Sequence, residues 1–253
     1  MIFFKKALNV GLICCLLAGA SNDFRSWYFK RNGEGVPPSA QEEINLEQYS
    51  AYYLGDITQK ELYLTFDEGY ENGYTSDILD TLLELKVPAA FFVTKPYIDA
   101  NPELIKRMVN EGHIVANHTD KHKSSPSLSP AELKEELLTT AKAFKDLTGL
   151  DMPKFFRPPM GQYSEQNLET IFEVGYSTIF WSFAYEDWIT EKQPGAEKAY
   201  NTIIKHLHPG GILLLHAVSS SNTEALGDVI KTALELGYTF KSLNQLPNLL
   251  NIL

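Results

Sequence analysis

Cysteine is almost absent from this chain, and this scarcity limits the chemistry that the protein can use. The two cysteines, Cys14 and Cys15, both lie within the N-terminal apolar segment. If that segment is removed, no cysteine is left, which excludes disulfides and thiolate metal sites from the mature chain. A metal ion bound by the mature chain must therefore be held by histidine and carboxylate side chains.

Positive charge is also scarce, and no dinucleotide fingerprint is present. The formal net charge is −10, which argues against binding to nucleic acid because a polyanion requires a basic face. A neutral or mildly anionic glycan is still compatible with this charge. No Gly-x-Gly-x-x-Gly follows the first predicted strand, so a dinucleotide-binding fold has no support. The apolar content of 44% is that of an ordinary globular protein.

The N-terminus resembles a targeting segment rather than a membrane span. Lys5 and Lys6 precede a short apolar run that ends in Ala-Gly-Ala before Ser21. A basic start, a short apolar run and small residues at its end are typical of a cleaved secretory signal, whereas a membrane span needs about 20 apolar residues. We predict that residues 1–20 are a signal peptide and that the protein is secreted across the cytoplasmic membrane. An uncleaved segment would leave the protein anchored in the membrane.

The remaining chain divides into an irregular arm at residues 21–58 and one domain at residues 59–253. From Glu61 onward, short apolar runs alternate with longer amphipathic stretches. Strands are expected at 62–66, 89–93, 114–117, 155–157, 177–181, 211–216 and 239–242. Helices are expected at 76–85, 102–111, 130–148, 165–174, 196–206 and 223–236. Such alternation implies parallel strands joined by helices. We predict an α/β fold, a distorted (β/α) TIM-like barrel with about seven parallel strands.

Residues suited to chemistry all follow or end predicted strands. In (β/α) barrels the chemistry lies at the C-terminal ends of the strands. The residues at these positions are Asp67, Glu68, His118, Arg157, Asp187 and His216. Their common position on one rim predicts a single active site.

His118 and His122 stand four residues apart in His-Thr-Asp-Lys-His. We expect them on one face of a helical turn, so that both imidazoles reach one divalent metal ion. Two surface histidines would show the same spacing. The metal interpretation is preferred because the pair follows a strand and has carboxylates at an equivalent position on the rim.

Asp67 and Glu68 offer two adjacent carboxylates where the first strand ends. One of them can ligate the metal while the other acts as a general base on a water molecule. Adjacent side chains of an extended segment point in opposite directions, so the pair must sit at a bend, for which Gly69 supplies the freedom. The alternative is that both are simply acids at a helix N-terminus.

Three further residues have predicted roles in orientation and proton transfer. Arg157, in a stiff Arg-Pro-Pro turn, would keep Asp67 ionised, although it could be an ordinary ion pair at a turn. Asp187 would pair with His216 and raise its pKa, which would make His216 a proton donor near neutral pH; a buried structural histidine is the alternative. Trp188 would form a flat apolar wall for a sugar face or an acetyl methyl group.

Taken together, these residues resemble the polysaccharide deacetylases that share the NodB homology domain, family 4 of the carbohydrate esterases. Five ordered motifs have counterparts: Thr-Phe-Asp-Glu-Gly, His-Thr-Asp-Lys-His, Arg-Pro-Pro-Met-Gly, Glu-Asp-Trp and Leu-Leu-Leu-His. They span residues 60–246. Within the family, the chain resembles the delta-lactam-biosynthetic de-N-acetylases in Thr-Phe-Asp-Glu-Gly-Tyr-Glu-Asn-Gly-Tyr, Phe-Trp-Ser-Phe-Ala-Tyr-Glu-Asp-Trp and Leu-Leu-Leu-His-Ala-Val-Ser.

The resemblance implies a function and a set of roles. The branch removes the N-acetyl group of N-acetylmuramic acid in peptidoglycan, ahead of muramic delta-lactam formation in spore cortex. Asp67 would be the base and His216 the acid, with Arg157 positioning Asp67 or holding the lactyl carboxylate of the sugar. The remaining roles are substrate contacts by Trp188 and Tyr70 and coordination of a divalent ion, zinc in our expectation, by His118, His122 and Glu68.

Two departures from the family motifs leave alternatives open. Glu68 stands where the family has a metal-ligating aspartate, and Ala184 stands where the fourth motif has its first aspartate. A deacetylase of peptidoglycan N-acetylglucosamine or of chitooligosaccharide, and a glycan-binding protein that has lost catalysis, are the alternatives. In each case the expected partner is a glycan strand. No nucleic acid or protein partner is predicted, and we expect a monomer.

Overall fold

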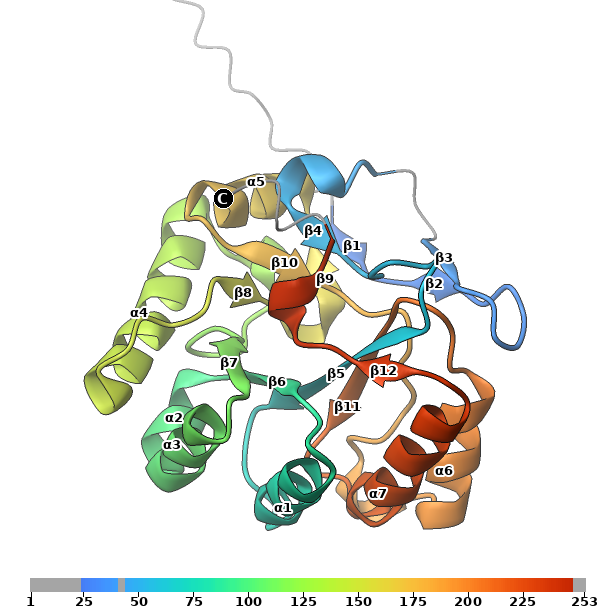
Figure 1. Cartoon of the computed structure of the whole chain (residues 1–253). Coiled ribbons are helices and arrows are strands. Elements are labelled where there is room, and N and C mark those ends of the chain that lie inside the picture. The colour runs from blue at the N-terminus through green and yellow to red at the C-terminus, as the bar shows by residue number, and fades with distance from the viewer. Residues whose placement is uncertain (1–23, 41–43, 248–253) are drawn as a thin grey trace, which may run out of the picture.

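The computed structural model describes residues 24–40 and 44–247 (Figure 1). The predicted signal peptide, with Cys14 and Cys15, lies outside the described residues. None of the helices in these two ranges is both long enough and apolar enough to cross a membrane.

An eight-stranded sheet forms the centre of the molecule. Its path runs β11-β5-β6-β7-β8-β10-β4, and β12 pairs with β5 beside that path. All of these pairings are parallel. The strands are β4 (Ala51–Tyr52), β5 (Glu61–Glu68), β6 (Ala89–Val93), β7 (Ile114–Asn117), β8 (Phe155–Phe156), β10 (Ser177–Ile179), β11 (Gly211–His216) and β12 (Thr239–Phe240). All seven predicted strands are present, and β4 from the N-terminal arm is an addition.

The sheet curls into a distorted barrel, as predicted. Isolated bridges link Leu54 to Gly211 and Phe183 to Leu213, so the two edges of the sheet meet without a continuous ladder. In the described part of the chain, seven α-helices connect or cover the strands: α1 (Thr75–Leu85), α2 (Lys95–Ala100), α3 (Pro102–Asn110), α4 (Pro130–Thr148), α5 (Glu165–Glu173), α6 (Ala196–Lys205) and α7 (Ser220–Glu235). Figure 1 shows them around the outside of the sheet.

The side chains of β5 alternate between two hydrophobic cores, one on each face of the sheet. Its odd-numbered residue Tyr63 packs inside the barrel with Phe92 and Ile212. Its even-numbered residues Leu64 and Phe66 pack outside, in the core that the helices cover. Because side chains of a strand alternate between its faces, this pattern also decides where the polar residues at the end of β5 point.

The helix boundaries follow from local chemistry. Ser129 and Glu132 form a capping box at the start of α4, which satisfies two otherwise free backbone N–H groups. Gly149 ends the same helix with a φ of 74°, a left-handed conformation that glycine adopts without a steric penalty. Helix α2 was not predicted, since its six residues are too few to display a periodic apolar face.

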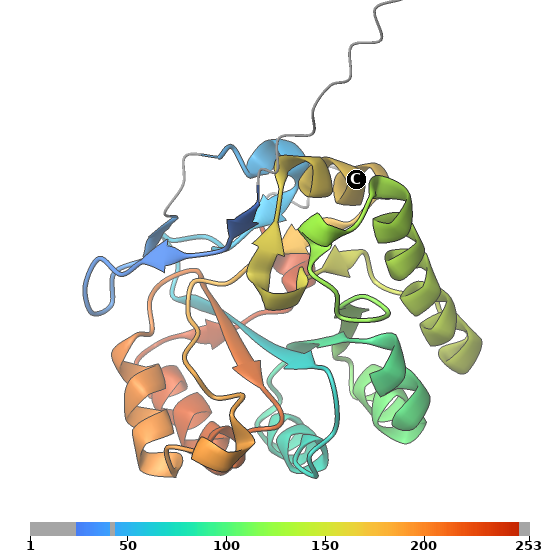
Figure 2. The same cartoon turned by 180° about the vertical axis from the view of Figure 1, so that it is seen from behind.

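The N-terminal arm is integrated into the domain (Figures 1 and 2). Besides β4, it contains β1 (Arg25–Ser26), which pairs with β9 (Gln162–Tyr163), and the short ribbon of β2 (Phe29–Lys30) and β3 (Ser39–Ala40). Trp27 stacks on Phe180, with 4.4 Å between ring centroids. The arm therefore supports the segments that follow β8 and β10.

Candidate active site

A cavity of about 660 Å³ opens at the C-terminal ends of the strands. It is lined by Asp67, Gly69, Tyr70, His118, His122, Met160, Gly161, Trp181, Trp188, Leu214, His216 and Val218. The rim predicted from the sequence thus carries a pocket, and most of the predicted site residues face it. The exceptions are Arg157, Glu68 and Asp187, which lie beneath or beside it.

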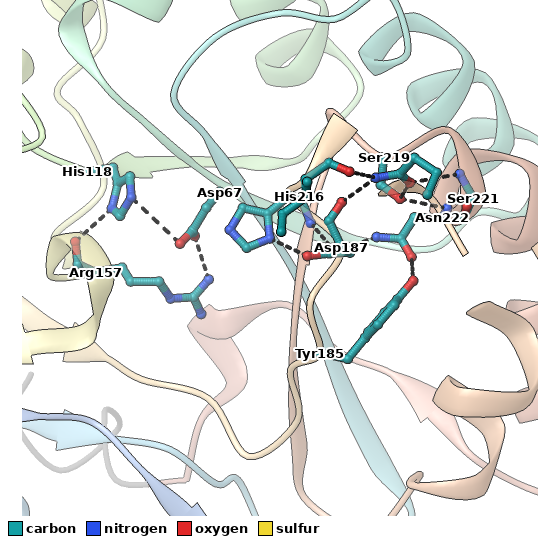
Figure 3. A network of polar contacts seen from close by, with 11 residues as sticks. Asp67, His118, Arg157, Tyr185, Asp187, His216, Ser219, Ser221 and Asn222 are labelled. Atoms are coloured by element: carbon teal, nitrogen blue, oxygen red, sulfur yellow. Dashed lines mark hydrogen bonds and ion pairs between the residues drawn. The ribbon is translucent and has the colours of Figure 1, made fainter. Parts of the chain in front are cut away.

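Arg157 holds Asp67 from below. Its Nη1 donates to Asp67 Oδ1 at 2.8 Å, which confirms the predicted contact (Figure 3). Burial raises the pKa of Asp67, but the charge of Arg157 and its hydrogen bond to Asp67, together with the neighbouring rings of His118 and His216, outweigh burial, so the pKa is lowered overall. Asp67 is therefore an oriented carboxylate anion at neutral pH.

Arg157 has no free surface for a substrate. Its side chain is 0% exposed, and Nε and Nη2 donate to the carbonyl oxygens of Ile179 at 3.0 Å and Phe180 at 3.3 Å. Each of the three guanidinium nitrogens therefore donates a hydrogen bond within the protein. This geometry fits positioning of Asp67 and does not fit the alternative in which Arg157 holds a lactyl carboxylate.

The expectation that His118 and His122 share a helical turn is wrong. The segment after β7 is an irregular loop in which Thr119 and His122 have φ values of 72° and 52°. These two left-handed residues fold the loop back, so the rings still meet, with centroids 4.9 Å apart. Such φ values are costly for non-glycine residues and are kept only where surrounding contacts enforce them.

Those contacts come from Asn117 and Glu136, which the sequence analysis did not single out. Asn117 Oδ1 accepts the backbone N–H of Thr119 at 2.9 Å, and the Glu136 carboxylate accepts that of Lys121 at 2.7 Å. Nothing in the sequence points to Glu136, because it lies on α4, distant in the chain from the loop that it holds.

Glu68 does not face the pocket. Strand β5 continues through this residue, so the predicted bend at Asp67 and Glu68 is absent and the two side chains lie on opposite faces. Glu68 is 0% exposed, and neither carboxylate oxygen has a hydrogen-bond partner. Burial, followed by the charges of Glu71 and Asp67, raises its pKa well above the ordinary value.

The histidine pair fits a divalent metal ion, and Glu68 does not take part. His118 Nδ1 donates to the Arg157 carbonyl at 2.8 Å, which leaves the Nε2 lone pair directed toward the pocket, 3.6 Å from Asp67 Oδ2. Burial lowers the pKa of His118 to about 4 and also lowers that of His122, so both rings are neutral, as metal ligands must be. Within residues 24–40 and 44–247, no group of three or more histidine, cysteine or acidic side chains is assembled around a metal position. Two neutral imidazoles that meet at the pocket fit a divalent metal ion, which such side chains commonly ligate.

His216 lies on the other side of Asp67 from His118, with Asp187 behind it (Figure 3). His216 Nδ1 donates to Asp187 Oδ1 at 2.7 Å, which confirms the predicted pairing. Burial lowers the pKa of His216, but the hydrogen bond and charge of Asp187 outweigh it and raise the pKa overall. Because Nδ1 is committed to Asp187, Nε2 is the nitrogen available for proton transfer.

Apolar side chains form the mouth of the pocket. Trp188 is 49% exposed, and Tyr70 and Met160 are each 55% exposed. The centroid of the Trp188 ring lies 5.5 Å from that of the His216 ring, so the exposed indole lies next to the His216 imidazole at the pocket mouth. Met160 was not predicted as a site residue; it has a φ of 57°, an unusual conformation within the Pro-Pro-Met-Gly turn.

Comparison with known proteins agrees with this site. The chain is 48% identical over 248 residues to an uncharacterized 30.6 kDa protein of Geobacillus stearothermophilus, which covers 97% of this chain and 94% of that protein. It is 42% identical over 246 residues to the peptidoglycan-N-acetylmuramic acid deacetylase PdaA of Bacillus subtilis, which covers 92% of this chain and 94% of that protein. The solved structure of PdaA, described as a family 4 carbohydrate esterase, matches with a TM-score of 0.86 over 89% of this chain and 97% of that chain.

The pattern of the polysaccharide deacetylase family also matches residues 55–179. This range includes the segments that carry Asp67, the histidine pair and Arg157. Together with the near full-length relatives, the match confirms the resemblance seen in the sequence: the chain belongs to the polysaccharide deacetylase family, family 4 of the carbohydrate esterases.

Proposed function

We propose that this protein is a secreted, metal-dependent hydrolase that removes the N-acetyl group from N-acetylmuramic acid of peptidoglycan, the step that precedes muramic delta-lactam formation in spore cortex. The observation that carries the proposal is a proton acceptor and a proton donor, each held by a buried partner, that face the same pocket. Asp67 is held by Arg157, and His216 is held by Asp187. The 42% identity to PdaA supports the choice of sugar.

The reaction follows from these positions. With the acetamide carbonyl in the pocket, Asp67 takes a proton from a water molecule while the oxygen of that water attacks the carbonyl carbon. As the C–N bond then breaks, His216 gives its Nε2 proton to the leaving nitrogen, so that acetate and a free amine are produced. Arg157 keeps Asp67 in place and ionised, and Trp188 offers an apolar face to the sugar ring.

A divalent ion, zinc in our proposal, would be held by His118 and His122. When bound, it would polarise the acetyl carbonyl and stabilise the negative charge that develops on its oxygen. Neutral imidazoles and the nearby carboxylate of Asp67 suit such an ion.

One observation favours a second candidate, the deacetylation of N-acetylglucosamine. No lysine or arginine lines the pocket among the described residues, and Arg157 is buried with each guanidinium nitrogen donating within the protein. A free lactyl carboxylate, which distinguishes muramic acid, therefore meets no lysine or arginine side chain in the pocket. A sugar without this carboxylate would need none.

The experiment is digestion of peptide-free peptidoglycan by the mature protein, with added zinc or with a chelator, followed by mass spectrometry of the sugars. We expect acetyl loss from muramic acid that the chelator abolishes. Loss from glucosamine alone would establish the second candidate. Glycan binding without acetate release under any divalent metal would reject both candidates in favour of a binding protein.

A further inference from the structure

Behind His216 lies a set of side chains that the reaction steps above do not use. Asp187 is buried, and its carboxylate accepts three hydrogen bonds. Oδ1 accepts from His216 Nδ1, while Oδ2 accepts the His216 backbone N–H at 2.9 Å and Asn222 Nδ2 at 2.5 Å. Asn222 is therefore the one side chain besides His216 in this set that fixes the rotation of the Asp187 carboxylate (Figure 3).

Asn222 is itself held on two sides. It is 2% exposed and lies in the first turn of α7, where its backbone N–H donates to Ser219 Oγ at 3.1 Å. Its side-chain oxygen accepts a hydrogen bond from the Tyr185 hydroxyl. This bond leaves the Nδ2 group as the end of the amide that faces Asp187, so Tyr185 sets the orientation of the amide.

Gln193 makes a second connection between the segment that carries Asp187 and the N-terminus of α7. Gln193 Nε2 donates to the backbone carbonyl of Asp187 at 2.8 Å, and its Oε1 accepts from Ser219 Oγ at 2.5 Å. The backbone of Asp187 is thus held independently of Asn222. Removal of the Asn222 side chain would free the Asp187 carboxylate to rotate without releasing the loop.

We propose that Asn222, oriented by Tyr185, is a positioning residue for proton donation: it holds Asp187 so that His216 presents Nε2–H to the leaving nitrogen. The inference rests on the proposed function. It concerns the single step in which the C–N bond breaks, its electron pair passes to nitrogen and nitrogen takes the proton of His216.

The need for an acid in this step allows an experiment to distinguish a positioning role of Asn222 from a merely structural one. An amide needs its nitrogen protonated to leave, whereas 4-nitrophenyl acetate releases a stable phenolate that needs no acid. A defect in proton donation therefore lowers amide hydrolysis and spares ester hydrolysis, while a damaged pocket lowers both.

The test compares both reactions in the full mature protein and in its Asn222→Ala, Tyr185→Phe and Tyr200→Phe variants. Tyr200→Phe is the matched control: it removes the Tyr200 hydroxyl, which bonds to Thr232 near the opposite end of α7 at 3.0 Å. For Asn222→Ala we expect kcat for acetate release from glycan to fall about 10- to 100-fold at unchanged KM, since one charge-assisted hydrogen bond is lost. Hydrolysis of 4-nitrophenyl acetate should change less than about 3-fold, because no acid acts in it.

Tyr185→Phe should shift the ratio of the two activities in the same direction by a smaller factor, and Tyr200→Phe should leave it unchanged. Equal losses of both activities in Asn222→Ala, or a normal ratio in both Asn222→Ala and Tyr185→Phe, would overturn the inference. Either result would leave the proposed function intact as long as the unaltered protein releases acetate from glycan. An unaltered protein that releases none would reject the proposed function instead.

Discussion

Asp67 and Glu68 are adjacent in the chain and face opposite sides of the same strand. Asp67 lines the pocket and is anchored by Arg157, whereas Glu68 is buried on the outer face of β5 with no hydrogen-bond partner. The two carboxylates consequently have opposite pKa shifts, lowered for Asp67 and raised for Glu68. Only Asp67 is placed for chemistry, and this separation has consequences for both metal binding and stability.

The first prediction concerns zinc affinity. Glu68→Gln should bind zinc as tightly as the unaltered protein, because Glu68 points away from the His118 and His122 pair. His122→Gln should weaken binding at least about 100-fold, because one of two imidazoles is lost. Competition with a fluorescent chelator measures both affinities. Equal weakening in the two variants would show that Glu68 turns into the pocket when the metal binds.

The second prediction concerns stability against pH. Because the pKa of Glu68 is raised in the fold, the folded state keeps a proton that the unfolded chain releases above about pH 4.3, and stability falls as pH rises toward the folded pKa. Glu68→Gln removes this proton. Its free energy of unfolding, relative to the unaltered protein, should therefore rise between about pH 4 and about pH 8.

Urea unfolding at the two pH values measures this difference. Glu84→Gln is the matched control, since Glu84 is an exposed acid on α1 and its replacement should give the same difference at both pH values. A Glu68→Gln difference that does not change with pH would mean that Glu68 titrates normally in the fold.

Much of the fold could be predicted from the sequence because buried parallel strands and capped helices leave local patterns. Such patterns predicted the apolar strands β6, β7 and β11 and the Ser129 cap of α4. Strand β4 could not be predicted, because two residues are too few to show an alternating apolar pattern and because its pairing with β10 depends on the whole barrel. Such pairings depend on contacts distant in the chain.

The candidate site shows the same division. The pairs of Asp67 with Arg157 and of Asp187 with His216 follow from placing strand ends on one rim. The loop of His122 could not be predicted, because its left-handed residues are enforced by Asn117 and Glu136 rather than by helix periodicity. The direction of Glu68 was predicted wrongly because β5 runs two residues beyond the predicted end at residue 66 and so includes Glu68.

The third prediction concerns the base. Asp67→Asn should lower turnover at least about 1,000-fold, because the amide cannot accept a proton. The fold should persist, since Arg157 keeps its bonds to two backbone carbonyls and Asn offers an oxygen to Nη1. Acetate release and circular dichroism measure the two effects. Substantial residual turnover would reject Asp67 as the base.

The fourth prediction concerns the arm. Trp27 donates from Nε1 to the Trp181 carbonyl at 2.9 Å and from its backbone to Gly161 at 2.7 Å, two residues that line the pocket. Trp27→Ala should cost about 3–5 kcal/mol of stability, as expected for loss of a buried aromatic ring. Urea unfolding measures it, with Tyr28→Ala as control because Tyr28 is 59% exposed. Equal effects of the two variants would show that the arm does not support the domain.

The fifth prediction concerns the acid and its pH dependence. Burial lowers the pKa of His216 and Asp187 raises it, with a net increase. In Asp187→Asn the main group that opposes the effect of burial on His216 is lost. The pKa of His216 should therefore fall below the ordinary value of about 6.5. Since only protonated His216 can donate, the alkaline limb of kcat against pH should move to lower pH, by about one unit or more.

The profile of kcat for acetate release, recorded at saturating glycan, measures this limb in the bound enzyme rather than in the free one. Asp228→Asn is the matched control, because Asp228 is an exposed acid on α7, the helix that carries Asn222. Its profile should coincide with that of the unaltered protein. An alkaline limb that stays in place in Asp187→Asn would mean that a group other than His216 delivers the proton.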